Sequence, residues 1–345
     1  PENVGAWETV VVSATLQEDK SALRNAADAL KRVLLKTPTN GAACLLYVQA
    51  LVSSGDVDGG QKAAEEFQGT DAGQKSLSVL LALQQIALGK QDYAAAERWL
   101  EKATEVEAAH PAVAQGRLRL LHAQGRFDDL AQVARELAKG TAEWVPDFLI
   151  SASSALAASP AHRSTALELC QRGVAIAPQN ARAHLALGEQ LYQSGNLEGA
   201  EQSYRRVLQI NPAHPDGLNN LAWVLATRDP NSDEALAISR EAVKLRHGDA
   251  NLHDTLAYIL RRRPAGLQEA REECLKVLEL APADSRLRGR SLYFLAQVCT
   301  QLNDARGGAK YSQEALAVEK PSDLFTAEER AQLEQWAQAG QARRG

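Results

Sequence analysis

The sequence has no methionine, and aromatic side chains make up only 5% of its 345 residues. No stretch approaches the roughly 18–20 consecutive apolar residues of a membrane-spanning helix, so we expect no membrane span in this segment. No signal peptide is visible either. Because the chain begins at Pro1 and lacks methionine, we interpret it as a trimmed segment or a mature form.

A large excess of charge is also missing. The formal net charge is −5 and the pI is about 5.9, which gives no general attraction to nucleic acid or to an anionic membrane. We therefore expect no nucleic-acid partner. The one dense charge run is Arg261–Arg263. It indicates either a site for an anionic peptide, lipid head group or phosphate, or a solvated turn whose arginines meet helix C-terminal carbonyls.

Motifs that carry chemistry are absent from the sequence. There is no phosphate-binding GxxxxGK[ST] loop, no GxGxxG, no HExxH and no GxSxG. The four cysteines and seven histidines show no metal-ligand spacing. We expect buried, inert thiols, no catalytic residue, no metal and no cofactor. A disulfide between Cys274 and Cys299 stays open as a minor alternative.

What the sequence does contain is a repeated helix pair, seen best in residues 181–212. The pair Leu187-Gly188 belongs to a first helix, which breaks at Gly195. A second helix follows, with apolar residues at steps of three or four, and Pro212 ends it because proline cannot continue a helix. We expect Gly188 and Ala200 to lie where the two helices cross. The apolar residues of the second helix are Ala200, Tyr204, Val207 and Ile210.

This pattern resembles the tetratricopeptide repeat (TPR) family, bacterial type, on the Leu-Gly pair, the turn glycine, the alanine, the following tyrosine and the closing proline. Repeats start near residues 7, 41, 77, 111, 147, 181, 215, 250 and 289. The resemblance implies an all-α fold, an α-α superhelix of about nine helix-turn-helix repeats, in a single solenoid over residues 1–345. A capping helix over about 326–338 would follow a capping box formed by Thr326 and Glu329.

In this family the first helices line a concave groove that binds a protein or a peptide. Carried over position by position, the resemblance implies a polar and aromatic groove in the later repeats, and a mostly apolar one in the second repeat. Trp223 and Tyr258 share one repeat position; they line one wall or, alternatively, pack against the next helix. The candidate partner-binding residues are Arg182, Glu189, Tyr192, Asn219, Asn220, Trp223, Asp254, Tyr258, Arg261, Arg262, Arg290 and Tyr293.

The resulting hypothesis is a non-enzymatic scaffold or adaptor that binds a protein or peptide partner in its concave groove. The arginines favour an acidic segment or a C-terminal carboxylate. The alternative is a regulatory or assembly segment of a larger bacterial envelope, exopolysaccharide or secretion component. The compartment stays open between a bacterial periplasm or envelope and the cytoplasm.

Overall fold

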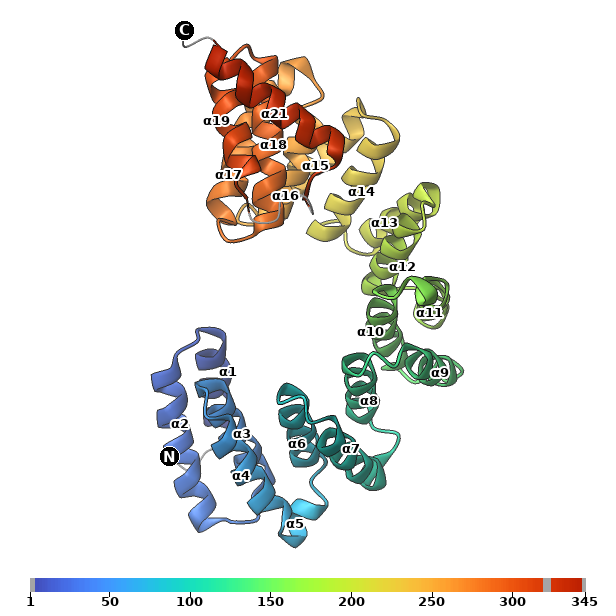
Figure 1. The fold of residues 1–345 in the computed structure, drawn as a ribbon. Coiled ribbons are helices and arrows are strands. Elements are labelled where there is room, and N and C mark those ends of the chain that lie inside the picture. Colours follow the sequence, from blue (N-terminus) through green and yellow to red (C-terminus); the bar gives the residue numbers. More distant parts are fainter. Residues whose placement is uncertain (1–3, 319–323, 343–345) are drawn as a thin grey trace. The chain divides into compact units, whose positions relative to one another are not determined.

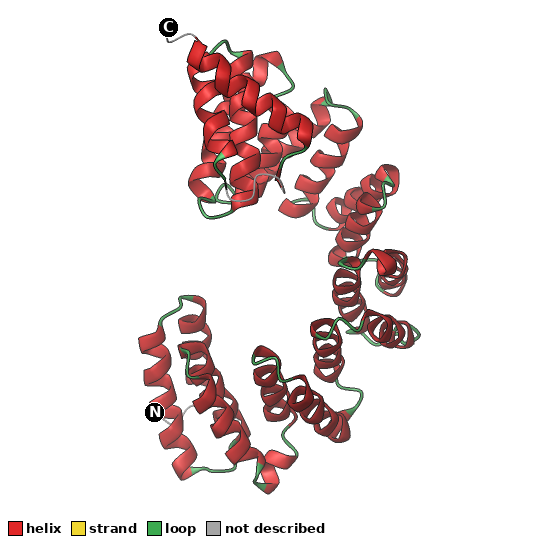
Figure 2. Cartoon of the chain, in the orientation of Figure 1, coloured by secondary structure: helices red, strands yellow, loops and turns green. Residues whose placement is uncertain are grey.

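A computed structural model describes residues 4–318 and 324–342 of the chain. Within these residues all regular structure is helical, and no strand occurs (Figures 1 and 2). The helices follow one another as antiparallel pairs that pack against each other and against the next pair. The predicted all-α class built from helix pairs is therefore confirmed.

The chain divides into two compact units, one ending at Arg172 and the other beginning at Gly173. The single solenoid expected over residues 1–345 stays a prediction. The helices of the N-terminal unit are α1 (Val4–Leu16), α2 (Lys20–Lys36), α3 (Gly41–Ser54), α4 (Val57–Gln68), α5 (Asp71–Gln74), α6 (Leu77–Gly89), α7 (Tyr93–Glu107), α8 (Pro111–Ala123), α9 (Phe127–Leu137) and α10 (Val145–Ala157).

Helix α11 (Arg163–Ile176) runs through the boundary in the sequence. The helices of the C-terminal unit that follow it are α12 (Ala181–Gln193), α13 (Leu197–Ile210), α14 (Pro215–Arg228), α15 (Asp233–Leu245), α16 (Ala250–Leu260), α17 (Leu267–Leu280), α18 (Ser285–Gln301), α19 (Ala305–Leu316) and α21 (Ala327–Ala342).

Six first helices begin at the residue where the sequence pattern places a repeat start: α3, α6, α8, α12, α14 and α16. Helix α18 instead begins at Ser285, four residues before the expected start near 289. The reason is the cap: Asp284 accepts hydrogen bonds from the backbone N–H groups of Arg286 and Leu287 and so opens the helix earlier.

The breaks between helices follow from local chemistry. Before α12, the side chain of Asn180 accepts from the N–H groups of Arg182 and Ala183. Between α12 and α13, Gly195 has a φ of +82°, which glycine adopts without the steric penalty of a side chain. Asn196 then caps α13 by accepting from Gly199 N–H at 2.9 Å. These signals fold the segment back on itself.

The crossing of α12 and α13 depends on small residues, as expected. Ala200 is 0% exposed and Gly188 is buried. The ring of Tyr204 fills the space beside Gly188: a Cβ added there would lie 2.5 Å from Tyr204 Cε1. The absence of a side chain at this position is therefore what lets the aromatic ring of the second helix lie against the first.

The C-terminal helix α21 packs on α18 and α19. The predicted capping box forms: Thr326 Oγ1 accepts from Glu329 N–H at 3.2 Å, and the Glu329 carboxylate accepts from Thr326 N–H at 2.9 Å. Leu333 is 0% exposed and Trp336 packs against the same cluster. The helix covers the apolar face that the last pair would otherwise expose.

All four cysteines are buried free thiols. Burial raises the pKa of Cys299 to about 11 and that of Cys44 to about 12. Cys274 and Cys299 do not form the disulfide that the sequence left open. The structure thus contains the buried thiols expected from the sequence, and their raised pKa values disfavour the reactive thiolate form.

A buried ion pair joins α16 to α17. His253 Nδ1 contacts the Glu273 carboxylate, and its Nε2 lies 2.9 Å from the carbonyl oxygen of His247. A carboxylate and a carbonyl oxygen both accept hydrogen bonds, so this arrangement favours a ring that is protonated at both nitrogens. The hydrogen bond to Glu273 raises the pKa of His253 above 6.5, against the lowering effects of burial and of Lys276.

We predict that Gly188→Ala destabilises the protein by about 1–3 kcal/mol, because the added methyl group overpacks against Tyr204. The matched control is Gly89→Ala at the end of α6, where an added Cβ meets nothing within 4 Å. There the loss of unfolded-state entropy should stabilise by about 0.4–1 kcal/mol. Denaturant unfolding of both variants checks the prediction, and changes of equal sign would contradict it.

We predict that the His253–Glu273 pair stabilises the fold in a pH-dependent way. Because the folded pKa of His253 is raised, its contribution is complete below about pH 6.5 and is lost as the pH rises through the folded pKa. Glu273→Gln should therefore cost roughly 1–2 kcal/mol at pH 5.5, and this cost should fall as the pH is raised. The exposed Glu272→Gln is the control, and a pH-independent deficit in Glu273→Gln would refute the assignment.

Candidate functional site

The C-terminal unit contains a cleft of about 300 Å³. Its walls come mainly from first helices, which lie side by side where α14 contacts α16 and α16 contacts α18. The second helix α13 supplies one residue. The cleft is lined by Glu189, Tyr192 and Gln193 of α12, Tyr204 of α13, Asn219, Asn220, Trp223 and Val224 of α14, Asn251 and Thr255 of α16, and Arg290 of α18.

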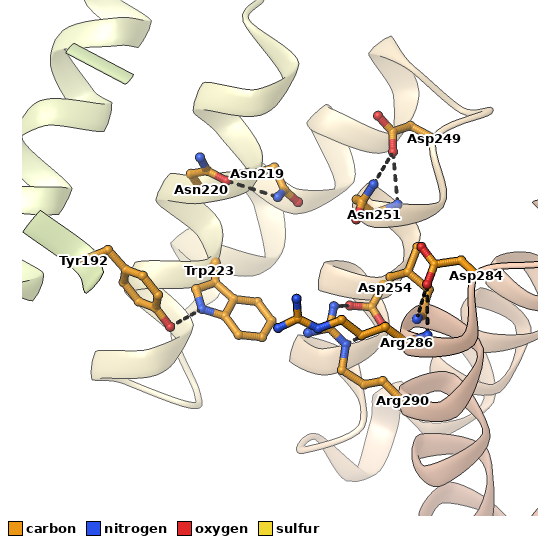
Figure 3. A network of polar contacts seen from close by, with 11 residues as sticks. Tyr192, Asn219, Asn220, Trp223, Asp249, Asn251, Asp254, Asp284, Arg286 and Arg290 are labelled. Atoms are coloured by element: carbon orange, nitrogen blue, oxygen red, sulfur yellow. Dashed lines mark hydrogen bonds and ion pairs between the residues drawn. The ribbon is translucent and has the colours of Figure 1, made fainter. Parts of the chain in front are cut away.

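Trp223 ties the walls of the cleft together. Its indole N–H donates to the Tyr192 hydroxyl at 2.7 Å, as Figure 3 shows. Its ring stacks on Tyr258 with centroids 4.3 Å apart and planes at 26°. The Arg290 guanidinium lies 5.5 Å from the same ring. Helices α12, α14, α16 and α18 are thereby joined through one side chain, at a gain of about 0.5–1.5 kcal/mol for each aromatic pair.

Arg290 is held by a buried carboxylate. Asp254 is 0% exposed, and the Arg290 guanidinium binds it through two nitrogens, with Nε to Oδ1 at 3.1 Å (Figure 3). Burial raises the pKa of Asp254, while Arg290 and then Arg261 act in the opposite direction. Asp254 lies beneath the surface, so its role is to fix Arg290 and to neutralise it.

The other arginines are also engaged within the chain. Arg261 donates to Gln297 Oε1 at 2.6 Å and lies over Phe294 at 4.3 Å. Arg262 lies 4.1 Å from the centre of the Tyr258 ring and donates to the Ala226 carbonyl at 3.4 Å. Burial, and then the charge of Arg262, lowers the pKa of Arg261. Their planar groups extend the aromatic stack that begins at Trp223.

Two asparagines form the polar floor of the cleft. Asn219 Nδ2 donates to Asn220 Oδ1 at 3.4 Å (Figure 3). Asn220 also acts on the hydroxyl of Tyr204: it lowers the pKa of that group, which burial and then the charge of Glu189 raise by more. The Oδ1 of Asn219 is buried and has no hydrogen-bond partner among the described residues. An unmet buried acceptor of this kind is costly and calls for a donor.

Glu189 is the exceptional charge in the cleft. No basic side chain in the described part of the chain lies within ion-pair distance of its carboxylate, and no hydrogen bond to it is formed there. Burial, and then the negative charge of Asp216, raises the pKa of Glu189. The arginine that lines the cleft, Arg290, is already bound to Asp254.

The structure brings half of the sequence-predicted residues together in the cleft. The six that line it are Glu189, Tyr192, Asn219, Asn220, Trp223 and Arg290. Three of the others support it from below or behind: Asp254, Tyr258 and Arg261. Arg262 stacks on Tyr258. Arg182 is an exposed residue in the first turn of α12.

Tyr293 needs a correction, because it faces no open surface. It is 8% exposed, its hydroxyl donates to Gln332 of α21 at 2.8 Å, and its ring packs against Phe325 and Trp336. The expectation that Tyr293 lines the groove is therefore wrong, because its side chain is used in packing against α21. Trp223 and Tyr258 have packing roles too, since they stack on each other. Trp223 takes part in both arrangements that the sequence left open, since it packs on Tyr258 of the next first helix and also lines the cleft.

Some cleft residues were missed. Asn251 and Thr255 line the cleft and occupy the second and sixth positions of their repeat. These are groove positions in the family, so carrying the groove positions over to this repeat was sufficient to find both residues. Tyr204 comes from a second helix, where the pattern indicated a core residue. It is indeed 2% exposed, but its hydroxyl reaches the polar floor. No signal in the sequence distinguishes such a ring from an ordinary core tyrosine.

The N-terminal unit has its own concave surface, formed by α3, α6 and α8. It measures about 1030 Å³ and includes Leu45, Val52 and Leu81. The apolar character expected for the second repeat is present here. At its edge Lys90 pairs with Asp58. In the described residues no group of three or more His, Cys, Asp and Glu side chains is arranged to hold a metal ion. Among the helices described, none is both long and apolar enough to span a membrane.

The chain also resembles known repeat proteins. Residues 163–222 match the model of the tetratricopeptide repeat family. A curated relative, the Protein CTR9 homolog of Arabidopsis thaliana, is 28% identical over 130 residues. That alignment covers 37% of this chain and 12% of the relative, so the chain spans only a small part of that protein.

Solved structures with a similar arrangement include a tetratricopeptide repeat protein from Parabacteroides merdae. It is 16% identical, with a TM-score of 0.49, over 77% of this chain and 98% of that one. The pilF protein of Pseudomonas aeruginosa is 16% identical, with a TM-score of 0.45, over 75% of this chain and 96% of that one.

We predict that Arg290→Met destabilises the protein by about 3 kcal/mol at pH 7, because it leaves Asp254 buried without its counter-ion. The deficit should shrink as the pH falls below 7, since burial raises the pKa of Asp254 and the protonated form tolerates burial. Arg286→Met, an exposed change on the same helix, should stay within about 0.5 kcal/mol. Equal losses in the two variants, measured by denaturant unfolding, would contradict the role given to Arg290.

Proposed function

We propose that the chain is a non-enzymatic scaffold of the tetratricopeptide repeat type, the family whose model residues 163–222 match. In our proposal it binds an extended or helical segment of a partner protein in the cleft of the C-terminal unit. The single observation that carries the proposal is the cleft itself, which is lined by aromatic, amide and charged groups from successive first helices.

The chemistry of the lining supports a peptide ligand. Tyr192 and Trp223 offer apolar area together with a polar edge, the combination that is enriched at binding hot spots. Asn219 and Asn220 offer amide groups that match the donors and acceptors of a peptide backbone. Thr255 and Gln193 add further polar groups at the walls. Fixed side chains of this kind lose little conformational entropy when a ligand binds.

Finer statements stay predictions. The sequence favoured an acidic partner segment because of Arg261, Arg262 and Arg290, each of which is engaged within the chain. The alternative of a regulatory or assembly segment in a larger bacterial envelope, exopolysaccharide or secretion component is open too. The full-length gene sequence distinguishes it, since an attached catalytic domain, lipid-anchor motif or membrane segment would support that alternative.

We predict that Gln193→Trp weakens peptide capture. Gln193 is exposed at the edge of the cleft, so the bulky ring should fill the opening and leave the packing unchanged. The measurement passes a random library of N-acetylated, C-amidated dodecapeptides over immobilised protein and titrates the peptides retained. Wild type should retain peptides, and Gln193→Trp should lower the affinity for these peptides at least about ten-fold.

The matched control is Gln202→Trp, an exposed substitution of the same kind on α13 that does not line the cleft. It should bind as wild type does. If wild type retains no peptide, or if both variants lose binding equally with the fold intact, the cleft is not a peptide site.

A further inference from the structure

We propose that the cleft of the C-terminal unit recognises a positively charged side chain of the partner segment, a lysine or an arginine, with Glu189 as its counter-ion. This inference rests on the proposed function and specifies the chemistry of the peptide. It differs from the acidic segment that the arginines of the sequence suggested.

The first observation is the unbalanced charge of Glu189. Every other ionised group at the cleft has a partner: Arg290 binds Asp254, and Asp216, beside Glu189, pairs with Arg246 at 3.3 Å. In the described residues no cation lies within 4.0 Å of the Glu189 carboxylate, although the side chain is partly buried. A carboxylate withdrawn from water without a counter-ion is unfavourable, and a ligand cation would relieve this.

The second observation is an unmet acceptor in the same cleft. Asn219 Oδ1 is buried without a hydrogen-bond partner among the described residues, and both Asn219 and Glu189 line the cavity. Acceptors require donors. A lysine ammonium carries three N–H donors and an arginine guanidinium carries five, so a cationic ligand supplies the donors that acceptors of this kind lack. An acidic ligand would supply only further acceptors.

The third observation concerns the surrounding surface. The aromatic side chains of Tyr192 and Trp223 line the cleft together with Glu189. Such rings suit the aliphatic stem of a lysine or arginine, which packs on apolar surface while the charged group reaches a polar partner. The negative faces of aromatic rings also attract cations. The Glu189 carboxylate, the Asn219 amide oxygen and the aromatic rings thus all favour a cationic side chain as the ligand.

The arginines do not reverse this balance. Arg290 is neutralised by the buried Asp254, and Arg261 and Arg262 do not line the cleft. Both stack on Tyr258, with Arg261 at 5.0 Å and Arg262 at 4.1 Å from the ring centre. Both guanidinium groups therefore interact with the aromatic side chain behind Trp223 and do not face the cleft. The charge that faces a ligand is that of Glu189.

The test uses the full chain and the same random library of N-acetylated, C-amidated dodecapeptides. Peptides retained by wild type should be enriched in lysine or arginine at one position. The tightest of them is then remade with norleucine at that position. Affinities are measured for both peptides with wild type and with Glu189→Gln. Replacing the cation should weaken binding to wild type at least about ten-fold and should change binding to Glu189→Gln little.

Glu198→Gln, an exposed change on α13 away from the cleft, is the matched control and should behave as wild type. If peptides bind but carry no basic enrichment, or carry acidic residues instead, the cation proposal fails while the proposed function stands. The same holds if norleucine weakens binding equally in wild type and Glu189→Gln. If wild type retains no peptide, the proposed function itself fails, and the inference with it.

Discussion

The close approach of α12 and α13 is the contact on which the architecture of the C-terminal unit depends. Gly188 presents no side chain, so the ring of Tyr204 can lie against its backbone, and Ala200 keeps the crossing tight. A helix pair closed in this way buries one stripe and leaves another uncovered. The next pair covers it, which places α14 beside α16 and α16 beside α18. The wall of first helices is a consequence of this stacking.

The wall gains its chemistry from contacts that join successive repeats. Trp223 bonds Tyr192 of the preceding pair and stacks on Tyr258 of the following one. Arg290 reaches back to Asp254, which lies 36 residues earlier and is fully buried. Such links make neighbouring repeats rigid with respect to each other, so the side chains at the cleft are held in place before a ligand arrives.

Much of the fold could be read from residues close together in the chain. Proline and glycine end helices because of their backbone chemistry, and the spacing of apolar residues fixes which helix face is buried. The starts of α12, α14 and α16 therefore agree with the sequence pattern. The capping box of Thr326 and Glu329 was equally readable, since its two hydrogen bonds span only three residues. Local rules suffice wherever both partners of an interaction lie within one turn.

The sequence by itself determined the helix pairs, the small residues at their crossing and the positions from which side chains reach the groove. It placed Glu189, Trp223 and Arg290 on one surface. Only the tertiary structure decided which of these charges is balanced. Asp254 cancels Arg290 from a different repeat, α21 covers Tyr293, and Glu189 is left without a cation among the described residues. The physical reason is that the charge balance of a cleft depends on partners about one repeat away, whose identity no local pattern specifies.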